Sequence, residues 1–106
     1  MQPKLIRQGD VLLRPVAALP PGLKPLESRT LAYGEQTGHA HVVIDGDVFV
    51  GEDGKLYVEA RHGSQLRHQD QSGAVAEHLS LTLEPGIYEV RTEEDYSPEG
   101  LRRVED

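Results

Sequence analysis

The sequence predicts an all-β protein, a single small antiparallel β-barrel or sandwich of short hairpins. Short runs such as residues 79–83 alternate apolar and polar residues with the period of two that a half-buried strand shows. Asp-Gly pairs at 45–46 and 53–54 separate such runs, and Asp-Gly is a strong hairpin signal. The runs recur about every 8–12 residues, and no stretch is typical of a helix of normal length. We therefore expect roughly eight short strands in one domain over residues 1–106.

The expected strands follow from this pattern in chain order. They are residues 11–16, 28–33, 39–44, 48–50, 56–60, 79–83 and 87–92, with shorter candidates at 65–68 and 101–104. Pro15 cannot donate to a ladder, so the first strand should lie at an edge or bend there. Residues 17–25 contain three prolines and read as a stiff loop. Asp45 and Gly46 should form a hairpin turn, after which residues 48–50 run back.

Composition limits the function classes. The chain has 18 acidic and 11 basic residues and a formal charge of −7, which argues against a nucleic-acid partner and favours attraction of cations. It has no Cys and no run approaching the ~20 apolar residues that span a bilayer, and residues 1–10 carry charges without the apolar run expected of a signal peptide. We therefore expect a cytoplasmic protein without a membrane partner. Hydrophobic residues make up only 37%, so burial completed in a homo-oligomer is the expectation.

The histidines carry the strongest chemical signal. His39 and His41 are two residues apart, so on a strand both imidazoles point to one face, with Ala40, Val42 and Ile44 directed to the core. Such a pair can present two ligands to one metal, and a third from a distant strand leaves positions open for water or substrate. His78 is the third candidate ligand and His68 the fourth. The predicted cofactor is a divalent metal: Zn, Fe, Ni or Mn.

Glu35 and Glu77 are the carboxylates nearest to these histidines in the sequence. Either could be a ligand, an acceptor that orients an imidazole, or a general base. No phosphate-binding loop of the G-x-x-x-x-G-K-[ST] type is present, so no nucleotide cofactor is expected. A pH-sensitive histidine cluster without metal is a further possibility, because imidazoles held close together titrate near neutral pH. In an alternative interpretation the histidines are incidental or stabilise a subunit contact. The chain is then a non-catalytic interaction or assembly module, phage-associated or ring-forming.

Two resemblances follow from these residues. Gly38-His39-Ala40-His41, followed by a later His and a Pro-Gly turn, resembles the metal motif of cupins. Cupins are double-stranded β-helix barrels that hold a metal with His-x-His, a downstream Glu and a later His, so the resemblance implies that His39 and His41 are ligands. The family's Glu has no counterpart at its usual offset, and His78 precedes the Pro-Gly turn instead of following it.

The whole chain is similar to a family of small bacterial and phage proteins whose role is unknown. The matching pieces are residues 8–13, 34–41 (with Thr-Gly-His-Ala-His), 77–78 (Glu-His) and 83–90 (Leu-Glu-Pro-Gly-Ile-Tyr-Glu-Val). This resemblance implies one fold over nearly the full length and a shared set of site histidines. His68 corresponds to an earlier family His only if residues 69–76 are an insertion. The resemblance implies no reaction, substrate or small-molecule ligand.

Overall fold

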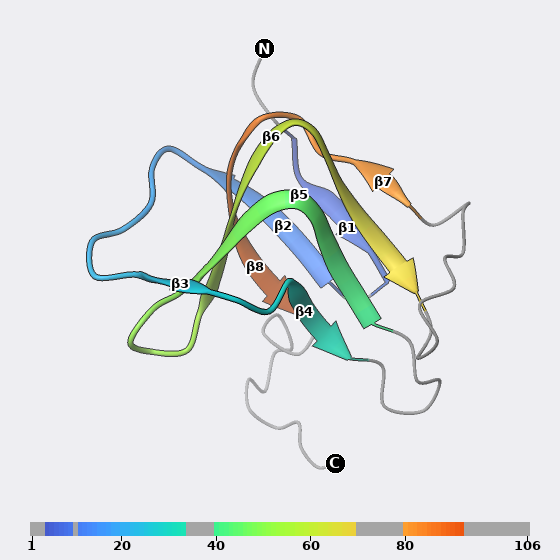
Figure 1. Cartoon of the computed structure of the whole chain (residues 1–106). Helices are drawn as coiled ribbons and strands as arrows, with labels where there is room; N and C mark the ends of the chain where they lie inside the picture. Colours follow the sequence, from blue (N-terminus) through green and yellow to red (C-terminus); the bar gives the residue numbers. More distant parts are fainter. Residues whose placement is uncertain (1–3, 10, 34–39, 70–79, 93–106) are drawn as a thin grey trace, which may run out of the picture.

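The computed structural model describes residues 4–9, 11–33, 40–69 and 80–92, and it is all-β (Figure 1). The strands are β1 (Ile6–Gln8), β2 (Val11–Val16), β3 (Lys24–Leu26), β4 (Thr30–Tyr33), β5 (Ala40–Val50), β6 (Leu56–Gln69), β7 (Leu81–Thr82) and β8 (Gly86–Thr92). Every described pair is antiparallel, which confirms the predicted fold class. No helix in these ranges is long and apolar enough to cross a membrane.

The strands form one sheet in the order β1-β2-β8-β6-β5-β3, with β4 also paired to β5 and β7 to β6. The described sheet is not closed into a barrel, because its backbone pairing stops at β1 on one side and at β3 and β4 on the other. Figure 1 shows the two longest strands, β5 and β6, arching strongly. The curved sheet packs side chains from most strands into a single core. Its members are Val11, Leu13, Leu31, Val43, Val48, Val58, Ala60, Leu66, Leu83, Tyr88 and Val90.

The arch arises where the register between β5 and β6 shifts, at the position of the predicted Asp-Gly hairpin turn. Asp45 has a φ of 59° and stands alone on β5 opposite residues 61–64 of β6, because the register passes from Ile44 facing Gln65 to Gly46 facing Ala60. The predicted Asp-Gly turn is therefore wrong: Asp45 alone takes a left-handed φ, in a bulge, Gly46 does not, and β5 continues to Val50.

Gly46 and Ser64 hold this bulge together. A Cβ on Gly46 would lie 3.0 Å from Cγ1 of Val43 and 3.2 Å from the carbonyl oxygen of Glu59, so only glycine fits without rearrangement. The buried Ser64 hydroxyl accepts a hydrogen bond from the Arg61 N–H (2.8 Å) and donates one to the carbonyl oxygen of Asp45. Its side chain thus replaces the backbone pairing that the bulge interrupts.

Several other expectations can be compared with the strands. Residues 11–16 and 87–92 are confirmed as strands and pair with each other, and Pro15 lies beyond the part of β2 that pairs with β1. Residues 53–54 form the β5–β6 connection, with Gly54 at a φ of 85°. The loop predicted for residues 17–25 ends earlier in the structure, because residues 24–26 form β3 at the edge of the sheet. The separate strands at 56–60 and 65–68 are one bent strand, β6.

Candidate functional site

His41 lies inside the molecule, on the opposite face of β5 from the one predicted. Its side chain is 5% exposed, and its neighbour on the same face, Val43, is 1% exposed, whereas Val42 and Ile44 are half-buried. The alternation of β5 predicts that Ala40, Val42 and Ile44 face the core and that the polar imidazole of His41 faces away from it. Because Val43 makes the other face apolar as well, hydrophobicity alone could not choose between the two faces.

The side chain of Gln8 allows His41 to be buried. Gln8 Oε1 lies 2.8 Å from His41 Nδ1, and Gln8 Nε2 donates a hydrogen bond to the carbonyl oxygen of Leu66 (3.0 Å). A carbonyl oxygen only accepts, so the amide is oriented with its own oxygen toward the imidazole. His41 Nδ1 must then carry the hydrogen, and the lone pair of the neutral ring is on Nε2. This contact fixes both the tautomer and the orientation of the ring.

The same bonds connect strands that are far apart in the sheet. Gln8 ends β1 at one edge, whereas Leu66 and His41 lie on β6 and β5, and β1 has no backbone pairing with either strand. Gly9 follows directly and approaches the ring closely. A Cβ built on Gly9 would lie 3.3 Å from His41 Cε1, and its φ of 60° also favours glycine. Gly9 therefore lies against the Cε1–Nε2 edge of the His41 ring.

His68, the fourth candidate ligand, lies beside His41 in the sheet. The two residues are register partners on β5 and β6, and their rings stack with centroids 4.7 Å apart and planes 6° from parallel. The lone pair of an imidazole lies in the plane of its ring, so two parallel stacked rings direct their lone pairs along separate planes. In this arrangement the pair does not converge on one ion, and a shared metal would require the half-buried His68 ring to turn.

The other predicted site residues, His39, His78, Glu35 and Glu77, lie outside the described residues. Within the described ranges, no group of three or more His, Asp or Glu side chains is placed to hold a metal ion. His62, which is not among the candidate ligands, is exposed on β6. Sequence reasoning missed Gln8. It appeared in the family resemblance as part of residues 8–13, but nothing local to it indicated a partner 33 residues away on β5.

A second polar centre surrounds Glu89 on β8. Arg14 Nε and the Arg91 Nε donate to its Oε1 at 3.0 and 3.2 Å, and Lys55 Nζ donates to its Oε2 at 3.2 Å. The Glu89 side chain is 6% exposed, whereas those of Arg14, Lys55 and Arg91 are 50%, 34% and 28% exposed. One nearly buried carboxylate thus binds three partly exposed cations, which come from β2, the β5–β6 connection and β8.

Burial and the three cations act in opposite directions on this carboxyl. Burial alone would raise the pKa of Glu89, but hydrogen bonds from Arg14 and Lys55 and the charges of Arg91 and Lys55 outweigh it, so the pKa is lowered. Tyr88, the next residue, is fully buried and donates to the carbonyl oxygen of Glu84 (2.7 Å). Burial, together with the charge of Glu84, raises the pKa of its hydroxyl, so Tyr88 is a neutral donor.

Comparison with known proteins defines the class of this domain. The model of a family described as a domain of unknown function (DUF8820) matches residues 7–93, and the chain belongs to this family. This match confirms that the chain belongs to a small uncharacterised family, as the sequence predicted. It does not confirm the Thr-Gly-His-Ala-His pattern as a family motif or the resemblance to cupins. No curated protein and no solved structure matches the chain. The protein is a small all-β domain of unknown function.

Proposed function

We propose that this domain binds a divalent transition metal (Zn, Fe, Ni or Mn) with His41 as its fixed ligand. The observation that carries the proposal is the contact between Gln8 and His41 Nδ1 at 2.8 Å. Histidines that ligate metals commonly donate their second ring N–H to a carbonyl or carboxylate, which fixes the tautomer and orients the ring. Gln8 supplies such an acceptor, and its own orientation is set by Leu66.

His68 is the proposed second ligand, after its ring turns out of the stacked arrangement. It is half-buried, and it is already the register partner of His41. His39 and His78 complete the proposed set, as the sequence predicts, with Glu35 or Glu77 as the base if the site is catalytic. A homo-oligomer in the cytoplasm also stays an expectation, since no described feature tests it.

The test is metal content of untagged protein, measured by elemental analysis after loading with Zn²⁺ and, in separate samples, Fe²⁺, Ni²⁺ and Mn²⁺. We expect near-stoichiometric metal in the wild type and at least a tenfold lower affinity in His41→Gln and His68→Gln. His62→Gln is the matched control, because it removes an exposed imidazole from the same strand as His68. Gln8→Ala should lower metal affinity about 10–100-fold while every ligand is retained.

Two results would contradict the proposal. Wild-type protein that is folded and takes up none of the four metals would exclude it and favour the interaction or assembly module. Equal metal uptake in wild type, His41→Gln and His62→Gln would place the metal elsewhere. The tautomer can be checked separately by long-range ¹H–¹⁵N correlation of the His41 ring in metal-free protein, where we expect the hydrogen on Nδ1.

A further inference from the structure

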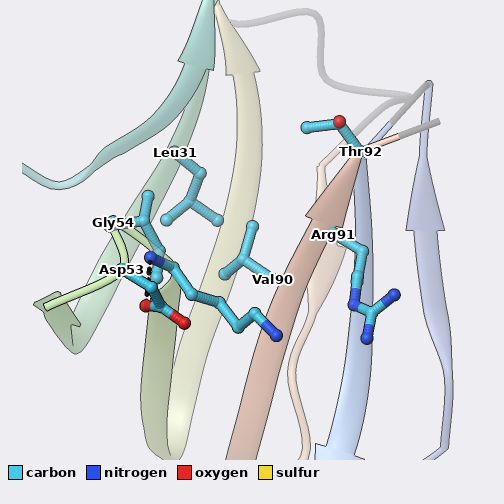
Figure 2. A pocket seen from close by; sticks show the side chains of 8 residues that line it. Leu31, Asp53, Gly54, Val90, Arg91 and Thr92 are labelled. Carbon is cyan, nitrogen blue, oxygen red and sulfur yellow. Dashed lines mark hydrogen bonds between the residues drawn. The ribbon is translucent and has the colours of Figure 1, made fainter. Parts of the chain in front are cut away.

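A pocket of about 320 Å³ lies where the chain passes from β3 to β4, beside β5. Its lining residues fall within 25–29 and 47–49, well inside the described ranges 11–33 and 40–69. In this it differs from the pocket of Figure 2, which reaches Thr92, directly before residues that the structure does not describe. The β3–β4 pocket shares no residue with the histidine site, and its volume is at the lower end of the range of small-molecule sites.

Pro25, Leu26 and Phe49 form the apolar part of the wall. Pro25 and Phe49 are register partners on β3 and β5, so their side chains lie on one face of the sheet. That face is the one away from the core, because the neighbouring Val48 belongs to the core. Phe49 is in turn the register partner of the half-buried Tyr57 on β6. An apolar strip thus runs from β3 across β5 to β6 on the outer face.

Arg29 supplies hydrogen-bond donors to the same pocket, and its guanidinium is held in place by the backbone. Its Nη1 donates to the carbonyl oxygens of Leu26 (3.1 Å) and Glu27 (3.3 Å), in the connection between β3 and β4. A guanidinium has five N–H donors, so the two used at Nη1 leave three, at Nε and Nη2. These three have no acceptor within hydrogen-bond distance among the described residues.

Asp47 supplies an acceptor beside these donors. Its Oδ1 lies 3.9 Å from Arg29 Nη2, which is too far for a direct hydrogen bond. An oxygen atom placed about 2.9 Å from the nitrogen and about 2.7 Å from the carboxylate oxygen would bridge the two groups. Arg29 and Asp47 share the outer face with Phe49, since Asp47 and Phe49 are two residues apart on β5. The gap between donor and acceptor therefore opens next to the apolar strip.

A hydroxyl group satisfies both sides of this gap. It accepts from the guanidinium and donates to the carboxylate, whereas an ammonium only donates and a carboxylate only accepts. The charges of the pocket are also balanced. Asp47 is already paired with Arg61, whose Nη1 lies 2.6 Å from its Oδ2, and the charge of Arg29 is matched in the lining by Glu27. The pocket therefore favours a neutral ligand over an anion or a cation.

We propose that this pocket binds a neutral sugar ring, with one hydroxyl between Arg29 and Asp47 and the ring carbons against Phe49 and Pro25. A sugar combines an apolar C–H face with several hydroxyls, which matches a wall that is apolar on one side and polar on the other. Neighbouring hydroxyls would use the other free donors of Arg29 and the carboxylate of Glu27. An added peptide strand fits less well, because β3 has only three residues and its central Pro25 has no N–H.

The experiment is a ¹H–¹⁵N NMR titration of the untagged full chain with the methyl glycosides of glucose, galactose, mannose and N-acetylglucosamine. We expect at least one of them to shift the amide signals of Leu26, Arg29 and Phe49 in a saturable way. The affinity should be in the millimolar range, because the Arg29 and Asp47 side chains are 43% and 41% exposed. Cyclohexanol, glucuronate and glucosamine should each bind at least threefold more weakly than the best glycoside, since they lack the hydroxyls or carry a charge.

A disaccharide that ends in the best sugar distinguishes two sources of the ligand. Tighter binding of the disaccharide than of the methyl glycoside indicates the end of a glycan chain, whose second ring lies toward Tyr57, next to Phe49. Equal binding of the two indicates a free sugar.

Substitutions locate the binding. Asp47→Ala should weaken binding of the best glycoside at least fivefold, and Arg29→Gln provides the same test if Asp47→Ala does not fold. Glu52→Ala is the matched control, since it removes an exposed carboxylate from the β5–β6 connection, outside the pocket. No saturable shift with any glycoside, equal binding in Asp47→Ala and Glu52→Ala, or binding of cyclohexanol or a charged sugar as strong as that of the best glycoside would each overturn the proposal.

Discussion

Two polar centres are buried in this small sheet, and they are stabilised in different ways. Around His41 the hydrogen bonds join a glutamine amide, an imidazole and a backbone carbonyl oxygen, without an ion pair between them. Around Glu89 the groups are charged, and one carboxylate is surrounded by three cations. The first centre depends on hydrogen-bond direction and closely fitted atoms. The second depends on charge and therefore on pH and salt.

This difference predicts how each centre fails. Loss of the Glu89 charge would leave three cations close together without a counter-charge, and water at their exposed parts offsets only part of this repulsion. The atoms around His41 are enclosed, and a group left there without a partner has no such compensation. These contributions can be separated by substitutions that remove a charge, remove hydrogen bonds or add a methyl group at one centre at a time.

The largest expected effect is that of Glu89→Gln, which keeps the shape of the side chain and removes its charge. Three cations would then face one another without their shared counter-charge, and we expect the free energy of unfolding to fall by about 2–3 kcal/mol. Urea unfolding measures it. Asp47→Asn is the matched control, because the Asp47–Arg61 pair is exposed and should contribute at most about 0.5 kcal/mol. Equal losses in the two variants would contradict the distinction between buried and exposed pairs.

Gln8→Ala should lower the free energy of unfolding by about 2 kcal/mol, since it removes two buried hydrogen bonds. The loss should be independent of salt, in contrast to that of Glu89→Gln, because no charge is involved. Chemical denaturation at low and high NaCl measures both variants. Arg7→Ala, at the preceding exposed position of β1, is the control and should change stability by less than about 0.5 kcal/mol.

Gly9→Ala and Gly54→Ala should differ although both place a side chain at a positive φ. Each should cost about 1 kcal/mol for its backbone conformation. Gly9→Ala should cost more, because its Cβ would lie 3.3 Å from His41 Cε1, whereas nothing lies within 4 Å of a Cβ on Gly54. Thermal unfolding compares the two, and only Gly9→Ala should shift the NMR signals of the His41 ring. Unchanged His41 signals would contradict the close approach.

The smallest expected effect is the pH dependence that Glu89 contributes. Its pKa is lower in the folded chain than the ordinary value of about 4.3, so its stabilisation is complete above that value and is lost as the pH falls through the folded pKa. The difference in unfolding free energy between wild type and Glu89→Gln should therefore shrink as the pH is lowered from 6 toward 2.5. If the difference in unfolding free energy instead grew on acidification, the pKa of Glu89 would not be lowered in the folded chain.

The fold class could be predicted because alternation and turn residues are local signals. Residues 11–16 and 87–92 were recognised as strands from neighbouring residues alone. The Asp-Gly pair at 45–46 predicts a hairpin but forms a bulge, because an Asp that tolerates a left-handed φ suits both structures. Of the candidate ligands, His41 and His68 are register partners, but the buried orientation of His41 could not be predicted from the alternation of β5.

Alternation and turn residues were sufficient to predict short antiparallel strands, because period and spacing act over a few residues. Only the tertiary structure decided which face of β5 is buried. That choice depends on Gln8, which reaches His41 and Leu66 from an edge strand and satisfies polar groups that would otherwise need water. It also decided that Glu89 collects Arg14, Lys55 and Arg91, because β2, the β5–β6 connection and β8 meet only in the folded sheet.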